Sequence, residues 1–472
     1  MNPWGQGLAS QLPWRGPTPH PLPAWLLIVL AVSAVVLLGR MERAATKPDP
    51  RAGNALVEIQ AKIVFAGTSL GGVAETMDAS EYADLAPTPG MAWRLAAFEA
   101  ATCTNPAMVE EDLLPFIESF DDQVATLGAE AVQTHEAVKR ALRDPAALDA
   151  AQSRLLEDRL GWFGRVLISH RSGSRDAMRA KAESEAQRVL WIAVGAVGAA
   201  VVALLCGFVL IIIALVQYLS PRQPLLFESP APSAPGAIYL EATALYLTLY
   251  VGLALFGGLI LGAAANPMFV GAAMLTLASL AGVVWPMVRF RDASAARRDL
   301  GLTCGRGVLR EVGAGVVGYV ACLPILALGI VVSMALALIH ALLAKGFGWE
   351  TAQGPEALHP IVEWVASGSS AQWIAALMLA AGFAPFFEEI MFRGALLSGA
   401  ARSLGTSSAI FVMAFIFAVI HPQGWVGVPA LMSIAIAFGL LRMWRRGCLI
   451  APMTAHALHN GSIVTVLMLL LW

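Results

Sequence analysis

Long apolar runs separated by short polar connections make up most of the chain. An α-helix needs about 20 apolar residues to cross the ~30 Å hydrocarbon core of a bilayer. We expect helices because lipid leaves no backbone group without a partner, and no barrel-like alternation is visible. The predicted spans are 24–40, 189–218, 237–263, 267–288, 311–343, 371–387 with a continuation towards 400, 406–421, 428–444 and 448–471. This pattern predicts one N-terminal span and a later block of eight.

A polar interval at 41–188 separates the first span from that block. Its apolar residues recur at spacings of three and four, as in QSRLLEDRLGWFGRVLISH, which predicts a mainly helical soluble domain. Its last stretch, SRDAMRAKAESEAQR, is expected to run as a helix straight into the second span. His135 and His170 are isolated in the sequence, and we interpret them as surface residues. We therefore expect an interaction, sensor or substrate-presenting domain, which would bind a protein partner.

The composition agrees with a membrane protein. Of 472 residues, 57% are hydrophobic and only 14% are charged, against about a quarter in soluble domains, and the mean hydropathy is +0.67. The expected fold is an all-α polytopic transmembrane bundle, with a Pro-rich tail at 1–23, a transmembrane helix at 24–40, the helical insert at 41–188 and an eight-span block at 189–472. The net charge of −2, without a basic patch, predicts no nucleic-acid partner.

Arginine and lysine in the short loops predict the orientation, because such loops face the cytoplasm when they are rich in these residues. The loop RFRDASAARRDLGLTCGRGVLR and the turn RMWRRG are arginine-rich, whereas the loop at 344–370 carries three glutamates and one lysine. We expect the two arginine-rich loops on the cytoplasmic side. Counting spans backwards then places 41–188 outside the cytoplasm.

Three polar clusters stand in the last hundred residues, each on a different predicted span. Ionisable groups at membrane depth cost free energy and are commonly functional. The clusters are Glu388, Glu389 and Arg393 in FAPFFEEIMFRG; His421 at the end of FAVIHPQ; and His456, His459 and Asn460 in HALHNG.

Helix geometry assigns different surroundings to the two glutamates. Successive side chains point about 100° apart, so Glu388 and Glu389 face different directions. Glu389 and Arg393 are four residues apart and can pair on one face. His456 and Asn460 have the same spacing on their own helix. One glutamate is thus expected in an ion pair, and the other is left for another partner.

Three kinds of chemistry suit these residues. A glutamate could take a proton from water while histidine and asparagine stabilise the oxyanion. Alternatively, Glu388, His421 and His456 could bind zinc with an open water position. The structural alternative is a buried ion pair that holds helices together. The sequence contains no HExxH motif, no aspartate in a predicted span and no partnered helical serine in its SGSS loop, which argues against other protease classes.

In these clusters the sequence resembles the CAAX-protease and bacteriocin-processing family, the CPBP or Abi intramembrane proteases. Members of that family carry EExxxR, FxxxH and HxxxN or HxxxD on successive transmembrane helices. Here the motifs stand in order as EEIMFR, FAVIH and HALHN. The resemblance covers 371–472 closely and the eight-span block loosely, and it does not extend to 1–188.

The resemblance implies a role for each matching residue. Glu388 would be the general base that activates water, and Glu389 with Arg393 would order the site. His421 and His456 would bind the water, the oxyanion or a metal, with Asn460 assisting. His459 has no place in the family pattern. Phe417, which begins FAVIH, is expected to pack rather than react.

The function implied is an intramembrane endopeptidase that cuts a membrane-associated protein or peptide in a bacterial inner membrane. No cofactor is certain, and zinc is the candidate metal. The alternatives are a proton-coupled transporter, in which Glu and His relay protons, and a catalytically inactive membrane scaffold.

Overall fold

The computed structural model shows an all-α protein, which confirms the predicted fold class. The structure describes residues 14–45, 50–69, 86, 88–103, 108–171, 176–221, 227, 229, 235–261, 267–290, 292–347, 364–366, 368–421 and 423–471. Within these ranges it contains no β-strand, only an isolated bridge between Trp14 and Phe290. The first 13 residues of the predicted Pro-rich tail and the acidic loop residues Glu350, Glu356 and Glu363 lie outside the described residues.

The chain divides into two compact units, and each is described by itself. The membrane unit comprises 1–48 and 199–467, and the insert unit comprises 49–198 and 468–472. The boundary predicted at 188 falls inside one helix, α12 (Ala177–Leu219). That helix continues without a break from its polar start into its apolar part, as expected from the sequence.

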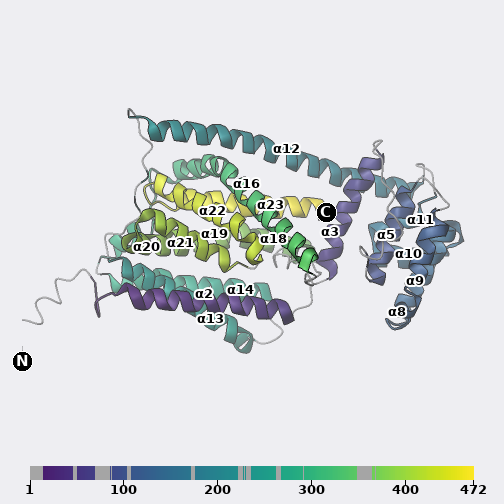
Figure 1. The fold of residues 1–472 in the computed structure, drawn as a ribbon, viewed down its shortest axis with the longest axis horizontal. Helices are drawn as coiled ribbons and strands as arrows, with labels where there is room; N and C mark the ends of the chain where they lie inside the picture. The colour runs from purple at the N-terminus through teal and green to yellow at the C-terminus, as the bar shows by residue number, and fades with distance from the viewer. Residues whose placement is uncertain are drawn as a thin grey trace, which may run out of the picture. The chain divides into compact units, whose positions relative to one another are not determined.

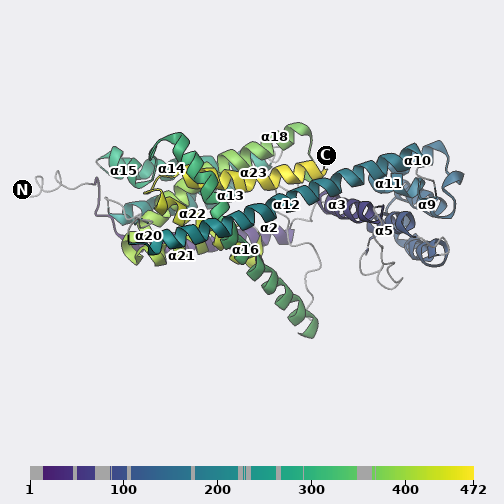
Figure 2. The same cartoon turned by 90° about the horizontal axis from the view of Figure 1, so that it is seen from above.

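The membrane unit is built from helices, most of its sequence lying in long ones (Figures 1 and 2). They are α2 (Pro21–Ala45), the end of α12, α13 (Gly236–Leu261), α14 (Pro267–Arg289), α15 (Ala293–Asp299), α16 (Val308–Phe347), α18 (Ser370–Met378), η3 (Leu379–Phe383), α19 (Ala384–Glu388), η4 (Glu389–Leu396), α20 (Leu397–Leu404), α21 (Thr406–Val419), α22 (Gly424–Trp444) and α23 (Ile450–Leu471). Here η3 and η4 are π-helical turns.

Seven helices of the described chain are long and apolar enough to cross a membrane. They start at Pro21, Ala177, Gly236, Val308, Ser370, Gly424 and Ile450. Two predicted spans, 267–288 and 406–421, fall on helices whose apolar described parts are shorter, Thr276–Arg289 and Thr406–Val419. The span predicted from 371 does continue, and ends at Leu404. The protein is thus an integral membrane protein.

The motif helices lie inside the membrane unit. In Figure 1, α21, α22 and the segment from α18 to α20 lie between α16 on one side and α2, α13 and α14 on the other. The most apolar 18-residue stretch of α16 is only 6% buried, whereas that of α22 is 44% buried. Of these two helices, α16 therefore presents more of its apolar side chains to lipid. Gly329 lets α16 approach α22, because a Cβ there would stand 2.3 Å from the Ser433 hydroxyl.

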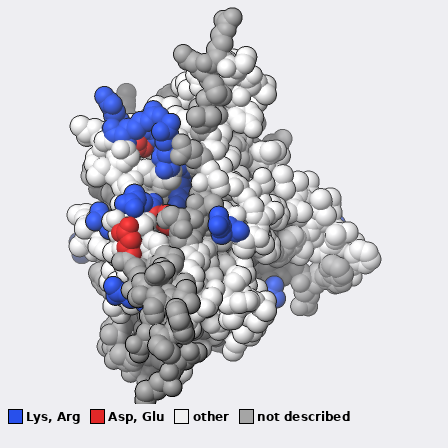
Figure 3. Space-filling view, turned by 90° about the vertical axis from the view of Figure 1, so that its left-hand side faces the viewer, with Lys and Arg blue, Asp and Glu red and all other residues white. Residues whose placement is uncertain are grey.

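Arginines gather at one end of the membrane unit (Figure 3). Arg297 on α15, Arg306 in the turn before α16 and Arg310 in the first turn of α16 are exposed. Arg445, which follows α22, forms an ion pair of 2.8 Å with Glu311 at the start of α16. This contact shows that the two arginine-rich connections share one end. That this end faces the cytoplasm stays a prediction.

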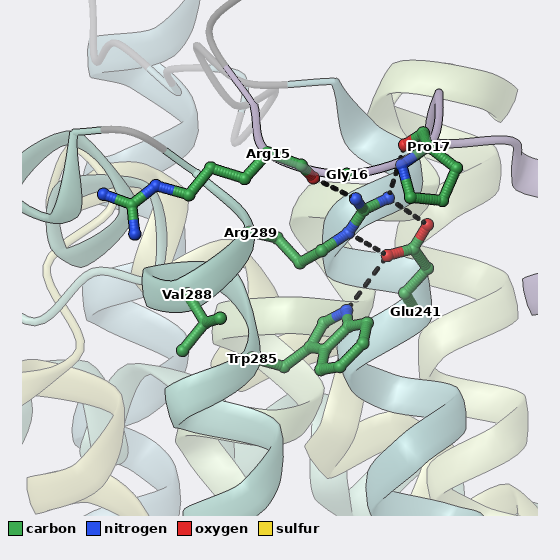
Figure 4. Close-up of a pocket in the computed structure, with 7 residues that line it drawn as sticks. All are labelled: Arg15, Gly16, Pro17, Glu241, Trp285, Val288 and Arg289. Carbon is green, nitrogen blue, oxygen red and sulfur yellow. Dashed lines mark hydrogen bonds and ion pairs between the residues drawn. The ribbon is translucent and has the colours of Figure 1, made fainter.

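Residues 15–17 of the N-terminal tail are held at the C-terminal end of α14, where they line a pocket of about 400 Å³ (Figure 4). The Arg289 guanidinium donates to the carbonyl oxygens of Arg15 and Pro17 and pairs with Glu241 at 3.1 Å. Trp285 donates its indole N–H to the same carboxylate at 3.0 Å. Arg289 therefore fixes the start of the described chain to α13 and α14.

The insert unit is a small helical domain with its own apolar core. Its elements are α3 (Pro50–Ser69), α5 (Pro89–Thr102), η1 (Val109–Leu113), α7 (Leu114–Glu118), α8 (Asp121–Ala125), α9 (Ala129–Arg143), η2 (Pro145–Ala147), α10 (Ala150–Leu160), α11 (Trp162–Ile168) and the start of α12. Trp162 is the largest fully buried side chain and packs edge-on against Phe65 and Phe163. Asp149 and Gln152 form a capping box that starts α10.

The expectation that His135 is an isolated surface residue is wrong. His135 is 2% exposed and lies between two partners. Its Nδ1 accepts the Trp93 indole N–H at 2.9 Å, so its Nε2 carries the proton and donates to Asp121 at 2.7 Å. Residues 42 positions apart thus complete this hydrogen-bond chain, and no local pattern signals them.

Glu99 is an acid of this core, and its burial clearly opposes the loss of its proton. It lies on α5, is 3% exposed, and has no ion pair among the residues that the structure describes. Burial raises the pKa of its carboxyl group to about 7, from an ordinary value of 4.5.

We predict that Glu99 makes the insert unit less stable as the pH rises from 4.5 to 7. In that window the unfolded state releases the proton while the folded state keeps it, so the free energy of unfolding falls; below 4.5 the group has no effect. Glu99→Gln should raise the calorimetric unfolding midpoint of the full chain at pH 7 and leave it unchanged at pH 4. An equal difference at both pH values would contradict this assignment.

Candidate active site

The first motif lies on one long helix that is interrupted twice by wide turns. The helix begins at Ser370 with a capping box formed by Ser369 and Gln372, and it runs through η3, α19, η4 and α20. The first wide turn is η3 and the second is η4; in each, a backbone N–H bonds to the carbonyl five residues back rather than four. Such π-helical turns are rare and are frequent at functional sites.

Glu389, Arg393 and His456 form a fully packed polar cluster. The carboxylate and guanidinium are both 0% exposed, and Arg393 Nη1 lies 2.9 Å from Glu389 Oε1. The pairing expected from their spacing of four is therefore present. His456 Nδ1 lies 2.9 Å from the same carboxylate oxygen. A single oxygen of Glu389 thus joins the first motif to the third.

Aromatic rings enclose the Arg393 guanidinium on two sides. Its carbon lies 4.6 Å from the Phe417 ring centre and 5.5 Å from the Phe438 ring centre. A cation held over ring faces in an apolar setting gains electrostatic stabilisation. Phe417 therefore packs, as expected, and its packing fixes the position of a charged group.

His456 stands between the two glutamates. Its Nε2 lies 3.9 Å from Glu388 Oε2, on the opposite side of the ring from the contact with Glu389. An imidazole presents nitrogens in two directions, so one ring contacts both carboxylates. Glu388 itself is 16% exposed, which leaves it the more accessible of the pair.

The second motif meets the third through the Phe417 ring. His421 follows the end of α21, and its Nδ1 lies 2.5 Å from the Phe417 carbonyl oxygen, to which it donates. The ring centre of Phe417 lies 4.3 Å from that of His421 and 6.4 Å from that of His456. Because Nδ1–H is used by the backbone, Nε2 of a neutral His421 carries the free lone pair.

Asn460 and His459 are placed differently from the carboxylate cluster. The Asn460 side-chain N–H₂ donates to the backbone carbonyl of Ala380, in the first wide turn, at 3.0 Å. The His459 ring lies against Tyr319 of α16, with ring centres 6.1 Å apart. Asn460 therefore holds the backbone that leads to Glu388.

The candidate metal ligands have suitable donor atoms but do not converge. Glutamate and two histidines are a known zinc set, and the Glu389 contact to His456 Nδ1 resembles the outer contacts that orient such ligands. Among the described residues, however, no group of three or more His, Cys, Asp or Glu is arranged to hold a metal ion. Zinc binding by Glu388, His421 and His456 therefore stays an alternative hypothesis to metal-free activation of water.

Sequence reasoning missed Arg442, which it counted as a loop arginine. The structure places it inside α22, 1% exposed, with its guanidinium donating to the Arg393 carbonyl within the second wide turn. Its position four residues after Phe438 continues the buried face of α22, and this spacing was the available signal.

Comparison with known proteins supports the resemblance seen in the motifs. Residues 370–462 match the family model described as type II CAAX prenyl endopeptidase Rce1-like. No curated protein and no solved structure matches the chain. The matched segment contains all three motifs, so the resemblance to the CAAX-type proteases is confirmed over this segment.

We predict that the two adjacent glutamates contribute unequally to stability. Glu389→Gln should lower the free energy of unfolding by about 3–5 kcal/mol, because it leaves the buried Arg393 charge uncompensated. Glu388→Gln should change it by less than ~1 kcal/mol, because that carboxylate is partly exposed and has no arginine partner among the described residues. Thermal unfolding of the purified protein in detergent measures both. Equal losses would contradict the different surroundings that we assign.

Proposed function

We propose, from the match of residues 370–462 to the Rce1-like endopeptidase family model, that this protein is an intramembrane endopeptidase. Its substrate would be a membrane-associated protein or peptide. The observation that carries the proposal is the pair of adjacent glutamates in different states: Glu389 is locked by Arg393 and His456, while Glu388 stays partly exposed beside the same histidine.

In the proposed mechanism Glu388 is the general base. A water molecule between Glu388 and the scissile carbonyl loses a proton to the carboxylate as its oxygen attacks the carbonyl carbon. Glu389 suits this role less well, because its side chain is 0% exposed and its Oε1 already contacts Arg393 and His456. The lone pair on His421 Nε2 would help to orient the water.

His456 would handle the charge and the proton that the attack creates. With Nδ1–H donated to Glu389, a second proton on Nε2 points towards Glu388 and the reacting centre. That N–H can donate to the oxyanion, and its proton or that of Glu388 then passes to the leaving amine as the C–N bond breaks. The contact of Asn460 with Ala380 would keep the backbone before Glu388 in register.

The proposed setting is a bacterial inner membrane, with the arginine-rich end of the membrane unit in the cytoplasm. The insert at 41–188 would then face outwards. Its independent core and its lack of a catalytic constellation among the described residues favour a role in binding a protein partner or presenting a substrate.

We predict that Glu388→Ala, His421→Ala and His456→Ala each reduce cleavage of a membrane-anchored reporter peptide by about 10²-fold or more. His459→Ala is the matched control, because that histidine lies on the same helix and packs against Tyr319 instead. It should cleave at the wild-type rate. Cleavage retained by the first three variants would overturn the proposed site.

We predict that cleavage does not require zinc, because Glu388, His421 and His456 are not arranged as a metal-binding group in the described chain and a carboxylate can activate water without a metal. Protein dialysed against a chelator should keep its activity, and elemental analysis should find well under one zinc per chain. Activity that is lost on chelation, restored by zinc and accompanied by zinc binding that His421→Ala removes would instead support the predicted ligand set.

A further inference from the structure

The second wide turn leaves one buried backbone carbonyl without its helical donor. In an α-helix the N–H of Leu397 would bond to the carbonyl of Arg393, four residues back. Here it bonds to the carbonyl of Phe392, five residues back. The Arg393 carbonyl therefore needs a donor from elsewhere, because an unpaired carbonyl in this apolar interior is costly.

Arg442 supplies that donor from another helix. Its Nη1 donates to the Arg393 carbonyl. The rest of the guanidinium is anchored nearby: Nη2 donates to the Asp299 carbonyl at 2.7 Å and to the Ser398 hydroxyl at 2.9 Å, and Nε donates to the Gly447 carbonyl at 3.3 Å. The planar fork of arginine suits such a set of fixed acceptors.

The first wide turn has the same problem and the same kind of solution. The N–H of Ala384 bonds to the carbonyl of Leu379, and the next residue, Pro385, has no N–H. The Ala380 carbonyl thus lacks both possible helical donors, and the Asn460 side chain donates to it. A side chain from a distant helix therefore completes each of the two turns that flank Glu388.

The wide turn decides where the glutamates point. It inserts one extra residue, which rotates everything before it by about 100° relative to everything after it. After the turn, Leu397 and Ala400 are fully buried in the core. Glu388, just before it, and Glu389, its first residue, both face His456. A regular α-helix could satisfy only one of these two arrangements.

We propose that Arg442 is a positioning residue of the active site, which holds the wide turn at Glu389–Leu396 open by binding the Arg393 carbonyl and so aims both glutamates at His456. Its relevance to cleavage rests on the proposed function. Its effect on the turn does not.

The test is amide hydrogen exchange of the full-length protein in detergent, with Arg442→Gln, Arg442→Lys and Arg289→Gln. Arg289 is the matched control, because it is also a buried arginine that donates to backbone carbonyls, but of residues 15 and 17 (Figure 4). Arg442→Gln should speed exchange in a peptide covering 388–400 by roughly tenfold. Arg289→Gln should leave that peptide unchanged, and Arg442→Lys should give an intermediate rate, because lysine keeps a donor without the fork.

Unchanged exchange at 388–400 in Arg442→Gln, or a uniform increase over the whole membrane unit, would overturn the proposal. If that variant does not fold, Arg442→Lys decides by the same local comparison. With a cleavable reporter, Arg442→Gln should lower kcat by about tenfold and leave KM unchanged, since Arg442 aims catalytic groups without touching substrate. Should the wild type cleave nothing, the proposed function fails while the exchange result still decides the role of Arg442.

Discussion

A carboxylate buried without any exposure to solvent is the constraint on which the site depends. Glu389 lies inside an apolar bundle, where an uncompensated charge would cost far more than the marginal stability of a protein. Arg393 and His456 compensate it, and the rings of Phe417 and Phe438 close around the arginine. The helices α21, α22 and α23 each contribute one of these groups. The three helices thus meet where their side chains replace water around one buried ion pair.

The second constraint is the backbone itself. The helix that carries the glutamates widens on both sides of Glu388, and each widening removes a hydrogen-bond donor from a carbonyl in the apolar interior. Asn460 and Arg442 replace the missing donors. A polar side chain inside a membrane protein is commonly taken as part of the chemistry. Here two of them donate to backbone carbonyls, and they affect the proposed chemistry only by fixing the position of the glutamates.

The contrast between Glu388 and Glu389 links these constraints to function. Adjacent residues on a helix necessarily face different surroundings, and in this site the difference is between a locked ion pair and a partly exposed base. His456 lies close to both, so its contact with Glu389 fixes the orientation of the ring that faces Glu388. An ordinary α-helical turn after Glu389 would separate this histidine from its partners.

By itself the sequence determined what depends on local spacing and on composition. It determined the all-α membrane fold, because apolar runs of sufficient length have no other stable form in lipid. It also determined the Glu389–Arg393 pair, because residues four apart meet on any helical turn, and the motif residues that the family match contains. Only the tertiary structure decided that His456 contacts both glutamates, that Asn460 donates to a backbone carbonyl and that Arg442 is buried. These depend on donors and acceptors that lie on different helices, up to 143 residues apart, and no local pattern of apolar and polar positions encodes such a meeting.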